Sequence, residues 1–191
     1  VDSGGTVDGY IYATGSTMGF LNGSGAYTFK VDADSRISLS NNNVSGAVNN
    51  TVFGKLAGDD LVNTGIANSF FGDNAGHAVS TGDYNVAIGI NSLDVATVPQ
   101  RMTAIGSAAI RGNVTAAAIG GVAVGYASLN ALTSGEGNTA VGYQSLLKNT
   151  DGDKSTAIGY NSLTNQVGTS DGVGNTALGH ASGDSITTGY S

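Results

Sequence analysis

Few side chains in this 191-residue sequence are of types that perform chemistry. It has two histidines, His77 and His180, one glutamate, Glu136, and no cysteine. A histidine binds zinc or transfers protons when a second ligand or an acid-base partner accompanies it. Neither histidine has such a neighbour in the sequence, so we interpret both as surface turn residues. The alternative is an axial metal site, formed if three copies of the chain bring one histidine together.

Aspartates are grouped in segments that read as turns. These groups are Asp59-Asp60, Asp151-Gly152-Asp153 and Asp171-Gly172. Calcium loops need oxygen ligands at set positions and either a closing glutamate or a glycine-aspartate nonapeptide, and neither pattern is present. A glycosidase needs two carboxylates at a fixed separation in a cleft, and variable turns do not favour that. The sequence therefore predicts no catalytic residue, no metal site and no cofactor, and a protein that is not an enzyme.

Three tyrosines recur at equal spacing and are the candidate ligand-binding residues. Tyr126, Tyr143 and Tyr160 follow one another at intervals of 17 residues. Exposed aromatic rings bind sugars by stacking on them, which would give a row of glycan contacts. Aligned aromatic side chains also stabilise stacked strands by contacting one another. Both interpretations remain open from the sequence.

The equal spacing reflects a nine-residue phrase that recurs along the chain. Residues 138–146 read NTAVGYQSL, residues 155–163 read STAIGYNSL, and residues 85–93 read NVAIGINSL. The central glycines are Gly54, Gly72, Gly89, Gly106, Gly125, Gly142, Gly159 and Gly179. Their separations lie between 17 and 20 residues. A fixed period of this length indicates a stacked repeat architecture.

Each repeat is too short for a pair of helices and instead reads as β-structure. An apolar residue precedes the glycine, a second short apolar run follows it, and a polar turn closes the unit, so we expect two short strands per coil. One apolar side chain per strand is expected to face inward, beside small residues. The asparagines that open the phrase are expected to form a ladder: Asn50, Asn68, Asn85, Asn138 and Asn175. The predicted fold is an all-β solenoid, or β-roll, of about eight coils of 17–20 residues.

The repeats occupy only part of the chain. Residues 1–40 lack the phrase and show short strand-like runs separated by Gly-rich turns, which predicts a small antiparallel β module. Residues 41–49 read as a linker, and residues 50–191 as the solenoid. Between Gly106 and Gly125 a near-copy of the phrase is out of step, so we expect a register shift or bulge there. The repeats are expected to continue beyond Ser191.

Composition narrows the classes of partner. The net charge of −7 and the lack of a basic cluster argue against nucleic-acid binding. No apolar run approaches the length of a membrane span, so the sequence predicts no membrane insertion.

The stretch of residues 145–152, followed by the phrase at residues 155–163, resembles the repeats of bacteriophage tail fibres and tail spikes. The stretch from Tyr10 to Asp32 also looks like a module found upstream of such repeats. The phrase is similar, too, to the β-roll heads of trimeric autotransporter adhesins, whose repeats are shorter. These resemblances imply a homotrimer in a fibre, and many phage fibres of this kind end in a self-cleaving intramolecular chaperone domain.

The resemblance implies a structural and attachment function. The chain is expected to be a shaft segment of a phage tail fibre, located in the virion and extracellular. Its expected partners are two further copies of itself, host surface glycans, and other fibre or baseplate proteins. Two alternatives remain: a bacterial surface adhesin or extracellular filament subunit at the cell surface, and a polysaccharide depolymerase.

Overall fold

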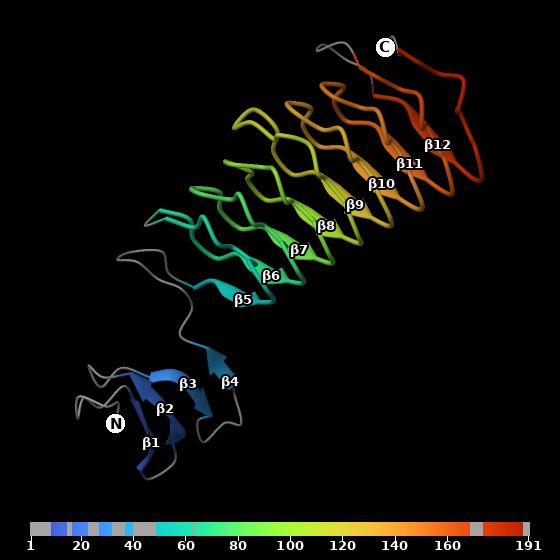
Figure 1. Cartoon of the computed structure of the whole chain (residues 1–191). Coiled ribbons are helices and arrows are strands. Elements are labelled where there is room, and N and C mark those ends of the chain that lie inside the picture. Colours follow the sequence, from blue (N-terminus) through green and yellow to red (C-terminus); the bar gives the residue numbers. More distant parts are fainter. Residues whose placement is uncertain are drawn as a thin grey trace. The chain divides into compact units, whose positions relative to one another are not determined.

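The structure, a computed structural model, is all-β over the residues that it describes (Figure 1). It describes the strands of residues 9–14, 17–22, 27–31 and 37–39 as backbone, and residues 49–62, 64–168 and 174–188 with their side chains. The chain divides into two units, Val1–Asn43 and Val44–Ser191. Asp171-Gly172 and the chain end at Ser191 lie outside the described residues.

The first unit contains four described strands. They are β1 (Gly9–Thr14), β2 (Thr17–Asn22), β3 (Tyr27–Val31) and β4 (Ile37–Leu39). Each strand pairs antiparallel with the next, in the order β1-β2-β3-β4. The register between β2 and β3 shifts at Phe20/Leu21.

The second unit contains eight described strands, each three residues long, stacked in sequence order as a β-solenoid (Figure 1). They are β5 (Thr51–Phe53), β6 (Ser69–Phe71), β7 (Val86–Ile88), β8 (Thr103–Ile105), β9 (Val122–Val124), β10 (Thr139–Val141), β11 (Thr156–Ile158) and β12 (Thr176–Leu178). Neighbouring strands pair parallel, and equivalent residues of the phrase lie opposite one another. The predicted β-solenoid of stacked repeats is confirmed.

Each described coil holds one strand of this sheet rather than the expected two. Each strand ends one residue before the glycine, and the chain turns a sharp corner just beyond the strand (Figure 1). Beyond the glycine the second and fourth residues are left-handed, for example Gln144 at φ 52° and Leu146 at φ 49°. A strand requires extended residues, so the run after the glycine is a turn. The turn is still tied to both neighbours, because the Gln144 amide donates to Tyr126 and the Leu146 amide to Ser162.

The strand residue that lines the interior is not the one before the glycine. The fully buried strand residue is usually the alanine, such as Ala140, whereas the apolar residue before the glycine, such as Val141, points outward and is half-buried or exposed. The inward-facing apolar residue of the strand is therefore this alanine, or Phe70 in β6, rather than the residue before the glycine. The run after the glycine adds a large inward-facing residue, since Leu93, Ile110, Leu129, Leu146 and Leu163 are fully buried.

The asparagine ladder is confirmed in the first three coils. The Asn68 side-chain amide donates to Asn50 Oδ1 at 3.1 Å, and that of Asn85 donates to Asn68 Oδ1 at 2.9 Å. Each amide also donates to a carbonyl at the far end of its own coil, such as Gly82 for Asn68. Buried amides of this kind close each coil and join it to the next.

The irregular coil between Gly106 and Gly125 keeps its strand register. β8 pairs with β9 without a shift, Thr103 opposite Val122. Of the two alternatives expected here, the strands show no register shift; the extra residues lie instead in the connection after Arg111, where Val114 donates to Gly112 and Ala118 to Thr115.

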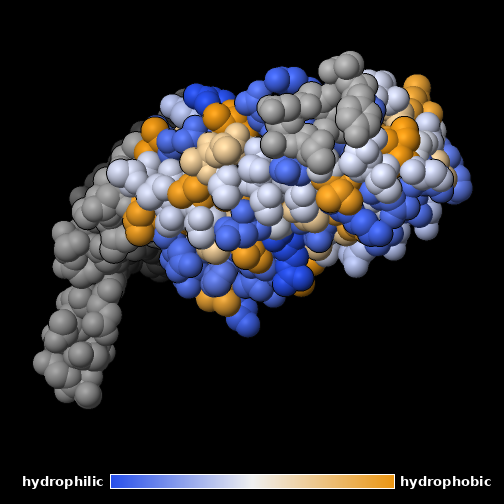
Figure 2. Space-filling view, turned by 90° about the horizontal axis from the view of Figure 1, so that it is seen from above, coloured by the Kyte–Doolittle hydropathy of each residue, from blue (hydrophilic) through white to orange (hydrophobic). Residues whose placement is uncertain are grey.

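The face seen in Figure 2 mixes hydrophilic with hydrophobic residues. This mixture accords with a sequence in which only 11% of residues are charged. Within the described part of the chain, no helix is both long and apolar enough to cross a bilayer.

Candidate functional site

A ladder of four stacked rings runs along the last four described coils. Tyr126 and Tyr143 stack with centroids 5.2 Å apart, and Tyr143 and Tyr160 at 4.9 Å with an interplanar angle of 7°. His180 continues the stack, 5.3 Å from Tyr160 and 9° from parallel. We call Tyr126, Tyr143, Tyr160 and His180 the aromatic ladder.

The backbone fixes the spacing of the aromatic ladder. Each ring follows the corner glycine of its coil, and the next residue donates its amide to the ring-bearing residue of the coil before. These bonds run from Gln144 to Tyr126 at 2.9 Å, from Asn161 to Tyr143 at 2.9 Å, and from Ala181 to Tyr160 at 2.7 Å. The rings are therefore held at the coil spacing, which is close to the ordinary distance between strands.

The orientation of the rings decides which of their surfaces a ligand meets. The faces of Tyr143 and Tyr160 are turned toward neighbouring rings, so a sugar ring has room to stack only on the two outer faces of the ladder. The three tyrosines are 41–49% exposed. Their hydroxyl groups have no hydrogen-bond partner among the described residues. The accessible surface is therefore a row of ring edges with unpaired hydroxyls.

The fourth ring was not among the sequence candidates. The sequence predicts only a surface turn residue at His180, because no second ligand accompanies it. Its position in the repeat does indicate a place in the ladder, since His180 follows Gly179 just as Tyr160 follows Gly159.

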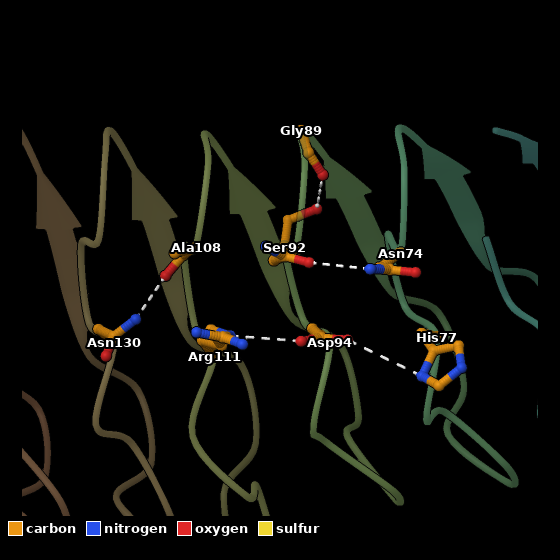
Figure 3. A network of polar contacts seen from close by, with 9 residues as sticks. Asn74, His77, Gly89, Ser92, Asp94, Ala108, Arg111 and Asn130 are labelled. Carbon is orange, nitrogen blue, oxygen red and sulfur yellow. Dashed lines mark hydrogen bonds and ion pairs between the residues drawn. The ribbon is translucent and has the colours of Figure 1, made fainter. Parts of the chain in front are cut away.

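The other histidine, His77, lies in a column of polar side chains on successive coils (Figure 3). Asp94 lies between His77 and Arg111. Its Oδ1 atom is 3.8 Å from His77 Nδ1, and its Oδ2 atom accepts a hydrogen bond from Arg111 Nε at 3.3 Å. Arg111 and Asp94 therefore form a cross-coil ion pair at a partly exposed surface, where such a pair contributes little stability. Among the described residues, no group of three or more His, Asp or Glu side chains is arranged to hold a metal ion.

Two aspartates of the turns serve as caps for backbone amides. Asp83 Oδ1 accepts from the Ile66 amide at 2.9 Å, and Asp153 Oδ1 accepts from the Glu136 amide at 2.8 Å. Asp151 accepts from the Thr150 hydroxyl. The contacts of Asp83 and Asp153 join neighbouring coils, whereas that of Asp151 lies within one turn.

A second surface feature is a row of apolar side chains on the outward face of the sheet, one before each repeat glycine. We call these residues the apolar row: Phe53, Phe71, Ile88, Ile105, Val124, Val141, Ile158 and Leu178. Its end members are the most exposed, Phe53 at 63% and Leu178 at 75%. Phe53 and Phe71 stack with centroids 6.4 Å apart. A continuous neutral strip therefore follows the strands.

A buried polar cluster joins the last three described coils. Gln166 is fully buried and donates to Ser155 at 2.9 Å and to Asn149 at 3.3 Å, while its own oxygen accepts from Asn175 at 2.9 Å. Ser155 stands at the position where five other coils have an asparagine, and Gln166 supplies the missing amide. The replacement leaves no pattern in the sequence, because the two residues are 11 positions apart.

Comparisons with protein-family models, with curated proteins and with solved structures find no match for this chain.

Proposed function

We propose that this chain is a shaft segment of a trimeric phage tail fibre, which holds a receptor-binding tip away from the virion and contributes to host-cell attachment outside the cell. A stacked solenoid suits a mechanical role, because each coil contacts only its neighbours and length grows with the number of coils. Eight coils extend over roughly 35 Å at about 4.8 Å per step.

The apolar row is the observation that carries the proposal. Apolar strips of this extent on a protein surface mark interaction sites. We propose that the apolar row contacts the equivalent rows of two further copies of the chain. The row repeats at the coil spacing and its members are uncharged, so another copy of the chain presents a row of the same period and chemistry. Three parallel solenoids then bury their apolar rows against one another around a common axis.

A charge placed in the apolar row tests this assembly. Ile158 is 39% exposed and lies in an interior coil, so Ile158→Asp leaves the coil foldable while placing a carboxylate in the proposed interface. Sedimentation velocity is expected to show trimers for the unmodified chain and smaller species for Ile158→Asp. The matched control is Tyr84→Asp, because Tyr84 is also exposed but lies outside the apolar row. Equal sedimentation of all three proteins would contradict an interface on the apolar row.

A further inference from the structure

We propose that the aromatic ladder binds extended β-1,4-linked polysaccharides that run along the solenoid axis. The inference rests on the proposed attachment function and names the class of host glycan that the shaft contacts. It adds His180 to the site and assigns binding to the edges of the rings rather than to their faces.

The spacing of the rings is the first support. The centroid distances along the ladder are 5.2, 4.9 and 5.3 Å. One pyranose unit of an extended β-1,4-linked chain advances by nearly the same length. Successive sugars therefore meet successive rings without bending of either partner. An α-1,4-linked chain coils instead, and leaves the ladder after a few units.

The chemistry of the ring edges is the second support. The hydroxyls of Tyr126, Tyr143 and Tyr160 each donate and accept hydrogen bonds, and none is paired among the described residues. A polysaccharide presents hydroxyl groups along its edges at each sugar unit. Because the ring faces already contact one another, the sugars bind through hydrogen bonds to this hydroxyl row, and only the ends of the ladder offer a face.

The charge of the surroundings favours a neutral polymer. The residues that flank the rings in sequence order are uncharged in all four coils. They are Val124, Val141, Ile158 and Leu178 before the glycines, and Ala127, Gln144, Asn161 and Ala181 after the rings. Acidic polysaccharides and nucleic acids need basic partners, which this strip lacks, and the chain carries a net charge of −7.

The test removes the hydroxyls and keeps the stack. The triple variant Tyr126→Phe, Tyr143→Phe and Tyr160→Phe retains all ring contacts. Calorimetric titration with cellohexaose and chitohexaose is expected to show binding to the unmodified chain, stronger than for the corresponding disaccharides. The triple variant is expected to bind the hexaoses about tenfold to a hundredfold more weakly, since three hydrogen bonds are lost. Tyr84→Phe removes an exposed hydroxyl outside the ladder and is expected to bind like the unmodified chain.

Other results would overturn the inference. If maltohexaose, which is α-1,4-linked, bound as tightly as cellohexaose, the match between ring spacing and sugar spacing would not explain binding. If the triple variant bound the hexaoses with unchanged affinity, the tyrosine hydroxyls would not be the binding groups. If the triple variant lost its assembly, the ladder would contact another copy of the chain instead. Sedimentation of the same samples separates the two proposals: a trimer that binds neither hexaose overturns only the glycan site, and a monomer that binds both overturns only the trimeric shaft.

Discussion

The ring of Phe70 lies against Gly76, six positions later in the same coil. A methyl group at Gly76 would stand 2.6 Å from the Cε2 and Cζ atoms of that ring. In the next coil the equivalent residues are Ala87 and Leu93, and both are fully buried. Gly76 and Leu93 share a left-handed backbone, at φ 61° and 53°. The strand and the turn therefore fill one interior volume together. The large side chain comes from the strand in the coil of Phe70 and from the turn in the coil of Leu93.

This exchange predicts strong coupling between the two positions. Gly76→Leu is expected to destabilise the fold by about 1–3 kcal/mol through overpacking, and Phe70→Ala by about 3–5 kcal/mol through the cavity that it leaves. The double variant Phe70→Ala/Gly76→Leu recreates the neighbouring coil and is expected to be more stable than Phe70→Ala alone. Denaturant unfolding of all four proteins completes the cycle. Additive costs would show that the two side chains do not share one space.

The repeat glycines are predicted to be structurally required inside the stack. Gly142 has φ 133°, and a Cβ there would lie 2.3 Å from the Gly159 carbonyl oxygen. We expect Gly142→Ala to cost more than about 2 kcal/mol, from backbone strain and this clash together, and Gly142→Val to cost more still.

Gly179 provides the matched control for Gly142. Its φ is 121°, but no other described atom lies within 4 Å of a Cβ built there. Gly179→Ala therefore carries only the backbone strain, on the order of 1–3 kcal/mol, and is expected to lose less stability than Gly142→Ala. Equal losses of thermal stability in Gly142→Ala and Gly179→Ala would argue against close approach of neighbouring coils at the glycines.

The buried asparagine ladder makes a separate prediction about stability. Asn68 donates to Asn50 and Gly82, and accepts from the backbone and side chain of Asn85. Asn68→Ala leaves several buried groups unpaired and is expected to cost about 2–4 kcal/mol. Asn165→Ala removes an exposed amide that donates to Asp184 and is expected to change stability by less than about 1 kcal/mol. Thermal unfolding of both variants makes the comparison, and similar melting temperatures would be inconsistent with a ladder that holds the coils.

The aromatic ladder is also predicted to stabilise the last coils. Tyr143 contacts rings on both sides, so Tyr143→Ala is expected to lower stability by about 1–3 kcal/mol, whereas Tyr143→Phe keeps both contacts and is expected to be neutral. Chemical unfolding measures the difference. A large loss in Tyr143→Phe would mean that the hydroxyl, rather than the ring, supports the fold.

The fold was predictable because its signal is the period itself. Equivalent residues such as Ala140 and Ala157 pair in register, as a stacked repeat requires. Which side of the strand faces the interior was not predictable. Both sides carry apolar residues, and the usual alternation of polar and apolar positions is absent. Val141 is larger and more apolar than Ala140, yet the alanine faces inward because Leu146 from the turn already fills the interior.

The candidate site was predictable in position but not in detail. Equal spacing placed Tyr126, Tyr143 and Tyr160 on successive coils. Whether the rings present faces or edges depends on side-chain torsions, which the spacing does not encode. The turn after the glycine could not be distinguished from a strand for a related reason. Left-handed residues such as Leu146 are unusual for an L-amino acid, and no residue type in this run indicates them.

The mass of the purified chain in solution tests the central claim, that the apolar row assembles three copies into a shaft. Multi-angle light scattering at micromolar concentration is predicted to give three times the chain mass of 18.9 kDa, stable on dilution. A well-folded monomer of 18.9 kDa under the same conditions would contradict the account.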